Sequence, residues 1–119
     1  MKKQIISLSY NRDHVTSGIL HIGVGNFHRA HLAFYMNNLL SDSSQNQWGI
    51  CGLNLLQGDE RIVKGLAKQD NLYTLTVCGR KGEDITYEIG SIIDHIWAVD
   101  NREAVINKFA DKDVKIITC

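Results

Sequence analysis

The sequence GILHIGVGNFHRAH, residues Gly18–His31, joins a short apolar run to a glycine turn and an amphipathic segment. The run Ile19–Ile22 lies between two glycines, which is typical of a buried strand in a parallel sheet. After the turn, Phe27, Ala30 and Phe34 recur at the spacing of one helix face, which predicts a helix packed on that sheet. We therefore predict a strand–turn–helix unit at the start of an α/β domain.

The remaining chain continues this alternation of strands and helices. The pattern predicts strands over 48–56 and 114–118, helices over 60–69 and from 100 onward, and a hairpin formed by 72–78 and 85–93. Asp100 and Glu103 have the spacing of a capping box, and Val105 and Phe109 would be the buried pair of that helix. The predicted fold is a Rossmann-like parallel sheet with helices on both faces and an inserted β-hairpin, incomplete at the C-terminus. No linker divides residues 1–119, so we expect one domain.

Charge and hydropathy argue against several classes of protein. Thirteen Lys and Arg residues balance thirteen Asp and Glu residues, whereas nucleic-acid and anionic-membrane partners select clustered positive charge. No apolar run approaches the roughly 18 residues needed to cross a bilayer, and the first residues lack the apolar stretch of a signal peptide. Cys51, Cys78 and Cys119 form no C-x-x-C pair, so we expect neither a disulfide framework nor a zinc site. The expectation is a cytoplasmic protein without a nucleic-acid or membrane partner.

The turn Gly23–His28 has the features of a phosphate-binding loop. In a parallel sheet, ligands bind beyond the carboxyl ends of the strands, where the first strand passes into the first helix. Gly23 allows a tight turn, and Gly25 removes the Cβ that would collide with a pyrophosphate. His28 occupies the position at which the dinucleotide fingerprint has a third small residue. We predict dinucleotide binding, and the alternative is a strand-to-helix turn that merely needs two glycines.

Three basic residues follow the glycines, namely His28, Arg29 and His31. Cations in the first turn of a helix oppose the helix dipole, whereas a bound polyanion would explain them. The alternative is a metal site formed by the H-x-x-H pair. Two ligands without a nearby acidic or cysteine third make a poor site, so we expect no metal.

An acidic residue beyond the second strand completes a dinucleotide signature, because it accepts hydrogen bonds from the adenosine ribose. Asp59 is the candidate, although it lies farther along than the usual spacing of about 20 residues. Asp59 could equally be the N-cap of the second helix, and Asn54 is a weaker candidate for the ribose. A carboxylate facing the ribose would repel a 2′-phosphate and favour NAD over NADP.

The sequence FHRAH at Phe27–His31 does not occur in ordinary dinucleotide-binding loops. Together with stretches at 48–52, 58–61, 69–75, 89–94 and 113–118, it resembles the mannitol dehydrogenase family of polyol-specific dehydrogenases. The resemblance implies a Rossmann domain and metal-independent hydride transfer between NAD and a sugar alcohol or a keto-sugar acid, with a lysine as general acid/base. The expected cofactor-binding residues are Ile22, Gly23, Val24, Gly25, Asn26, Phe27, His28, Arg29, Ala30, His31 and Asp59.

The resemblance covers only the opening part of such an enzyme. Family members continue into a largely helical substrate domain, where the catalytic lysine lies in a K-x-x-x-x-N-x-x-H pattern that does not occur here. We therefore expect residues 1–119 to be the N-terminal part of an NAD-binding domain, without catalytic residues and inactive alone. The alternatives are a stand-alone nucleotide-binding module, an inert truncated product, and a Rossmann enzyme acting on a phosphorylated sugar. The choice among mannitol, fructuronate, tagaturonate and arabinitol depends on substrate contacts outside this segment.

Overall fold

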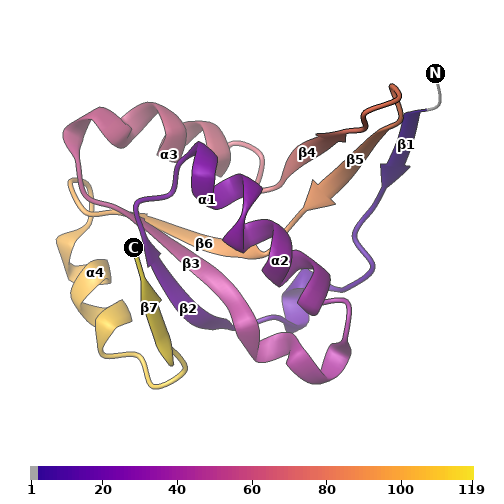
Figure 1. Cartoon of the computed structure of the whole chain (residues 1–119). Coiled ribbons are helices and arrows are strands. Elements are labelled where there is room, and N and C mark those ends of the chain that lie inside the picture. The colour runs from indigo at the N-terminus through magenta and orange to yellow at the C-terminus, as the bar shows by residue number, and fades with distance from the viewer. Residues whose placement is uncertain (1–2) are drawn as a thin grey trace.

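The computed structural model describes residues 3–119 and confirms the α/β class, with two sheets rather than one (Figure 1). The larger, parallel sheet has the order β6-β3-β2-β7 and contains β2 (Ser17–Ile22), β3 (Gly49–Asn54), β6 (Ile92–Trp97) and β7 (Ile116–Thr118). The smaller sheet has the order β1-β5-β4 and contains β1 (Lys3–Ile6), β4 (Tyr73–Cys78) and β5 (Asp84–Ile89). The helices are α1 (Asn26–Ala30), α2 (Leu32–Leu39), α3 (Glu60–Ala67) and α4 (Arg102–Phe109).

The strand order of the parallel sheet creates a switch point between β2 and β7. Leu20 of β2 pairs with Cys51 of β3 on one side and with Ile117 of β7 on the other. The chain thus builds from β2 outward to β3 and β6, and then crosses to the opposite side of β2. Because ligands bind where a doubly wound sheet reverses in this way, the strand order places a crevice at the carboxyl ends of β2 and β7.

Helices cover both faces of the parallel sheet, as predicted. Ile19 and Ile50 pack with Ala33 of α2 and Leu66 of α3 on one face. On the other face, Leu20, Cys51 and Ile96 pack with Ala104 and Val105 of α4. Ile19 and Leu20 serve opposite cores because successive strand residues point to opposite faces. Among residues 3–119, no helix has both the length and the apolar character needed to span a bilayer.

The inserted hairpin is confirmed as β4 and β5, but the prediction of one strand over 85–93 is wrong. β5 ends at Ile89, and a new strand, β6, begins at Ile92 and joins the parallel sheet. The chain leaves one sheet for the other at Ser91, which is fully buried and donates a hydrogen bond to the carbonyl of Ala33 (2.6 Å). β1, which the sequence did not predict, pairs in parallel with β5.

The single helix predicted from the glycine turn to Leu40 is broken at His31. His31 has φ −121° and ψ −91°, outside the helical region, and separates α1 from α2. The break interrupts the spacing that links Phe27 to Phe34. Phe27 is therefore 76% exposed and stacks on the ring of His31, with centroids 4.1 Å apart, instead of joining the core.

Three details of the C-terminal segment also differ from the prediction. The N-cap of α4 is Asn101 rather than Asp100, and its Oδ1 accepts a hydrogen bond from the backbone N–H of Ala104 (3.0 Å). Val105 is half-buried, but Phe109, the last residue of α4, is 47% exposed. β7 begins at Ile116, two residues later than predicted.

Asn37 of α2 connects the smaller sheet to the parallel sheet. Its Oδ1 accepts hydrogen bonds from the backbone N–H of Gly90 (3.0 Å) and from the hydroxyl of Tyr10, and its Nδ2 donates to the carbonyl of Glu88 (3.1 Å). Burial raises the pKa of Tyr10 to about 12, so the phenol remains a neutral donor. The junction between β5 and β6 is thus held by this buried amide together with Arg12, which donates to the carbonyls of Gly90 (2.9 Å) and Ile92 (2.8 Å).

Candidate functional site

The glycine turn lies between the carboxyl end of β2 and the start of α1. Gly23 has φ +93°, a left-handed conformation that favours glycine, and its N–H donates to the carbonyl of Leu53 (2.7 Å). α1 begins at Asn26, so the amides of its first turn have no intrahelical acceptor. The turn therefore presents backbone donors at the end of the strand, as a phosphate-binding loop requires.

Gly25 has no structural reason to be glycine. Its backbone is extended, with φ −148°, which any residue adopts. Within residues 3–119, a Cβ at Gly25 would meet no atom closer than 4 Å apart from its own chain neighbours. The missing side chain therefore serves no internal packing, and it leaves the backbone open to close approach by a ligand.

Arg29 is held against the turn by three interactions. Its Nε donates to the carbonyl of Gly25 (3.3 Å), its Nη2 donates to Oδ1 of Asn26, and its guanidinium lies over the ring of Tyr73, 5.9 Å from the centroid. The Tyr73 hydroxyl in turn donates to the carbonyl of Arg29 (2.6 Å). Arg29 thus supplies a fixed positive charge beside the turn.

His28 does not supply positive charge, so the prediction of three cations in the first helical turn is wrong. It is 3% exposed and stacks on His21 of β2, with ring centroids 3.7 Å apart and planes 13° from parallel. Burial, together with the smaller effects of the neighbouring His21 and His95, lowers the pKa of His28 to about 3, so the ring is neutral. The stacked pair fills the space where a third small residue would let helix and strand approach.

The H-x-x-H pair does not converge. His28 points inward to His21, whereas His31 is exposed beside Phe27. Within the described residues, no three His, Cys, Asp or Glu side chains form a cluster that could hold a metal ion.

A cavity of about 420 Å³ lies at the switch point between β2 and β7. The predicted residues that line it are Gly23, Gly25, Asn26, Phe27 and His28. His21 and Thr118 also line it, and His21 Nδ1 lies 2.7 Å from Thr118 Oγ1, which ties the ends of the two strands together. The sequence reasoning missed both residues, although the rule that parallel strands end at the same edge could have placed them there.

The other predicted site residues surround this cavity without lining it. Ile22 ends β2 and is half-buried, Val24 is buried in the core, and Ala30 ends α1. A neighbouring hollow of about 660 Å³ is lined by Asn26 and Arg29 and by Gly58, which lies in the short 3-10 turn between β3 and α3.

Asp59 lies beyond the carboxyl end of β3 and occupies the N-cap position of α3. Its side chain does not cap that helix; instead, Oδ2 accepts a hydrogen bond from the backbone N–H of Leu56 (3.1 Å). The carbonyl of Leu56 in turn accepts a hydrogen bond from Nε1 of Trp97 (2.9 Å), at the end of β6. Asp59 therefore occupies the N-cap position, as the alternative predicted, but its side chain does not make the predicted capping hydrogen bond.

Asn54, weighed above only as a ribose contact, reaches the glycine turn instead. It ends β3, is 2% exposed, and donates from Nδ2 to the carbonyl of Val24 (3.1 Å). Its Oδ1 lies 2.6 Å from Nε2 of His95 on β6. His95 was not identified from the sequence.

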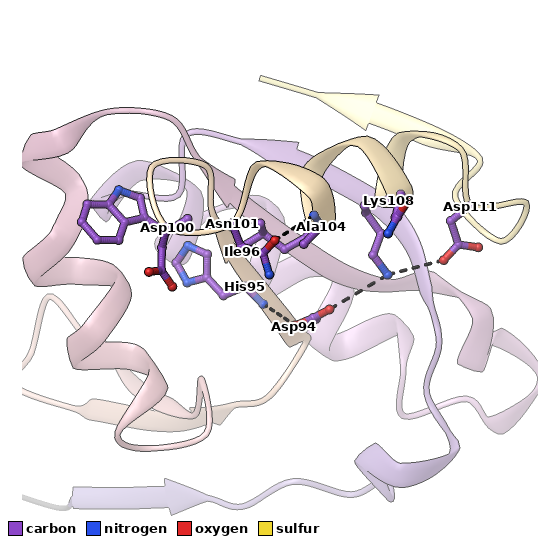
Figure 2. Close-up of a pocket in the computed structure, with 10 residues that line it drawn as sticks. Asp94, His95, Ile96, Asp100, Asn101, Ala104, Lys108 and Asp111 are labelled. Atoms are coloured by element: carbon purple, nitrogen blue, oxygen red, sulfur yellow. Dashed lines mark hydrogen bonds and ion pairs between the residues drawn. The ribbon is translucent and has the colours of Figure 1, made fainter.

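A separate polar groove of about 440 Å³ lies between β6 and α4 (Figure 2). Lys108 Nζ lies 3.4 Å from Asp111 Oδ2 and 4.0 Å from Asp94 Oδ2, so one lysine is shared by two carboxylates. Figure 2 shows His95 at the wall of this groove, near Asp100. The groove is distinct from the cavity at the switch point, and His95 lies between the two.

Comparison with known proteins identifies a consistent set of relatives. A family model described as the mannitol dehydrogenase Rossmann domain matches residues 17–119. The chain is 44% identical over 110 residues to a mannitol 2-dehydrogenase of Phaeosphaeria nodorum, which covers 92% of this chain and 19% of that protein. It is 48% identical over 104 residues to a mannitol 2-dehydrogenase of Aspergillus fumigatus, with coverages of 87% and 20%.

A solved structure shares the fold. The mannitol 2-dehydrogenase of Pseudomonas fluorescens, in a ternary complex with NAD and D-mannitol, superposes with a TM-score of 0.91 at 36% identity. The match covers 98% of this chain and 24% of that one. The chain therefore spans about a fifth to a quarter of the length of the relatives that it matches.

Proposed function

The chain belongs to the mannitol dehydrogenase family, and we propose that it forms the N-terminal part of the NAD-binding domain of an oxidoreductase that interconverts a sugar alcohol and the corresponding keto-sugar. Mannitol and fructose are the first substrate pair to test, because the relatives described above are mannitol 2-dehydrogenases. Hydride transfer would need residues beyond these 119, since no K-x-x-x-x-N-x-x-H pattern occurs among them.

The observation that carries this proposal is the bare backbone at Gly25. Neither the φ angle at this position nor the surrounding protein atoms require a glycine. A ligand that approaches the turn closely would explain why the side chain is missing. The turn lies at the switch point of the parallel sheet, where a dinucleotide fits. The residues present therefore suit a pyrophosphate.

In this proposal, each part of the turn has its own role. The backbone from Gly23 to Asn26 donates hydrogen bonds to the pyrophosphate, and Arg29 adds positive charge from a fixed position. Phe27 and His31 present an exposed ring pair beside the cavity, and His28 supports the turn from below as a neutral ring. When bound, NAD supplies the nicotinamide that accepts or donates the hydride.

Asp59 would receive the ribose hydroxyls of the adenosine. Its carboxylate lies beyond β3, next along the same sheet edge from the glycine turn, and would repel the 2′-phosphate of NADP. The Asp59→Ala variant should lose affinity for NAD and gain affinity for NADP relative to wild type. Calorimetric titration of both cofactors tests this, and an unchanged ratio of the two affinities would exclude the role.

The proposed function is tested by titrating NAD into the purified 119-residue chain. We expect wild type to bind NAD and Gly25→Val to lose binding while keeping its circular dichroism spectrum, because a Cβ at this position has no protein atom within 4 Å and the added side chain would occupy the approach path. Thr76→Val, on the exposed hairpin, is the matched control and should bind as wild type does. Absence of NAD binding by wild type, or equal binding by Gly25→Val, would refute the proposal. Oxidation of mannitol by the chain alone would refute the statement that it lacks the catalytic residues.

A further inference from the structure

The buried side chain of Asn54 contacts both the glycine turn and the neighbouring strand β6. Its Nδ2 faces the carbonyl oxygen of Val24 in the glycine turn (3.1 Å), and its Oδ1 faces Nε2 of His95 (2.6 Å). The carbonyl of Val24 only accepts hydrogen bonds, so the amide nitrogen of Asn54 must face it. This orientation leaves Oδ1 toward His95, and Nε2 of His95 must therefore carry a hydrogen.

The protonation state of His95 agrees with this direction. Burial lowers the pKa of His95, against the raising influence of Asp94 and Asp59, so the ring is neutral. Its second nitrogen, Nδ1, is buried and finds no hydrogen-bond partner among residues 3–119, which suits the unprotonated position of a neutral ring. The hydrogen bonds thus run in one direction, from His95 to Asn54 and from Asn54 to Val24.

The bond to Val24 decides which way the next amide points. The peptide between Val24 and Gly25 is planar and trans, so its C=O and N–H point in opposite directions. Because the carbonyl of Val24 is held inward by Asn54, the N–H of Gly25 must point away from Asn54. On the other side of Val24, the N–H of Gly23 is held by the carbonyl of Leu53 (2.7 Å), so β3 fixes the turn at two points.

Gly52 provides the space in which these groups meet. A Cβ at Gly52 would lie 2.7 Å from Cγ2 of Val24 and 3.0 Å from Cδ2 of His95. The first distance is too short for a real carbon contact and the second is unusually tight, so Val24 and His95 pack directly on the bare backbone of β3. Gly52 of β3, His95 of β6 and Val24 of the turn are therefore fitted to one another.

We infer that Asn54 and His95 are positioning residues for the proposed cofactor: together they hold the carbonyl of Val24 inward and so orient the N–H of Gly25 for a pyrophosphate. His95 acts through Asn54 and touches neither the turn's donors nor the ligand. The inference rests on the proposed function for its ligand, but the geometry of the turn is a property of the chain itself.

The test compares NAD with adenosine, which lacks the pyrophosphate. Asn54→Leu and His95→Leu should each weaken NAD binding, by about tenfold or more for Asn54 and less for His95, as expected from loss of a buried hydrogen bond. Adenosine binding should not change, because it does not use the turn. His95→Gln retains a donor toward Asn54 and should restore most of the NAD affinity. Equal weakening of NAD and adenosine, or wild-type NAD affinity in both leucine variants, would overturn the inference.

A second measurement needs no cofactor. The ¹⁵N order parameter of the Gly25 amide should be high in wild type and lower in both leucine variants, with His95→Gln close to wild type. His95 is only half-buried, so its variants keep the test available if Asn54→Leu does not fold. If wild type fails to bind NAD, the proposed function is wrong, and the order parameters alone decide the inference. Unchanged order parameters at Gly25 in a folded variant would refute the positioning role.

Discussion

The two sheets of this chain have strands of similar length but differ sharply in burial. Every residue of β3 is buried and five of the six in β2 are, whereas no residue of β4 is buried and Val77 is 46% exposed. Figure 1 shows the smaller sheet extending away from the helix-covered body of the molecule. The glycine turn, Asn54 and His95 all lie at or near strand ends of the buried sheet, whereas the smaller sheet contributes only Tyr73 of β4, which contacts Arg29. The contrast indicates that precise backbone geometry is held by covered strands, while the exposed sheet tolerates change.

The largest expected effect comes from a core substitution in the buried sheet. Leu20 of β2 is fully buried in the core that α4 covers, so Leu20→Ala should lower the free energy of unfolding by about 3 kcal/mol. Val77→Ala in β4 is the control and should cost less than about 1 kcal/mol, because the side chain is already half in solvent. Urea denaturation measures both. Equal losses at the two positions would contradict the contrast between the sheets.

A somewhat smaller effect is expected where the sheets are joined. Asn37→Leu removes the acceptor for the N–H of Gly90 and the donor to Glu88, and should cost about 2 kcal/mol. The loss should fall mainly on the smaller sheet, so amide hydrogen exchange should accelerate in β4 and β5 more than in β2 and β3. Uniform acceleration throughout both sheets would show that they unfold as one unit.

Acid should destabilise the parallel sheet at the end that forms the candidate site, where His21 and His28 stack. The strands of the smaller sheet contain no histidine and should not respond in this way. The pKa of His28 is about 3 in the folded chain against 6.5 for a free imidazole, and the pKa of His21 is also lowered by burial. Between these values the unfolded chain binds more protons, so stability is full above pH 6.5 and falls as the pH drops toward 3. The loss at pH 5 should be about 2 kcal/mol from His28.

Thermal melts between pH 7 and pH 5 measure this dependence. His28→Phe keeps a stacked ring without a titrating nitrogen and should flatten the curve, whereas Thr76→Val, which removes no titrating group, should leave it as in wild type. A His28→Phe variant with the full wild-type slope would show that the stacked pair is not the cause.

The smallest effect is expected on the exposed face of the hairpin. Thr76 and Thr86 face each other across β4 and β5 with hydroxyl oxygens 2.9 Å apart, in contact with water. Thr76→Val should change the free energy of unfolding by no more than about 0.5 kcal/mol. A change as large as that of Leu20→Ala would mean that the smaller sheet is as well packed as the larger.

Local patterns were sufficient to predict the strands that are covered on both faces. The runs at Ile19–Ile22 and around Gly49–Asn54 are mostly apolar, as is typical of strands covered by helices on both faces. β6 escaped prediction because Asp94 and His95 interrupt its apolar run, which an edge strand tolerates. β1 carries no local signal for its position, since its partner β5 lies at a great distance along the chain.

The candidate site likewise contains residues that a local sequence pattern predicts and residues that only the tertiary structure brings together. Gly23 and Gly25 were predicted because a strand–turn–helix with glycines is a local signal. The neutral state of His28 could not be predicted, since the basic residues of the HRAH sequence do not reveal which ring is buried against His21. The contact from His95 through Asn54 to Val24 joins three separate segments, which the pairing of β3 with β6 on one side and with β2 on the other brings together.

The hydrogen bond from Trp97 to Leu56 gives the chain a built-in optical reporter. Trp97 is almost fully buried, and its indole is fixed to the backbone segment that leads to Asp59. The only other tryptophan, Trp48, immediately precedes β3 at the opposite end of that strand. Replacing Trp48 by phenylalanine would leave a single fluorophore beside the proposed adenosine end of the crevice. Its emission could then follow ligand association there in real time, without an attached dye.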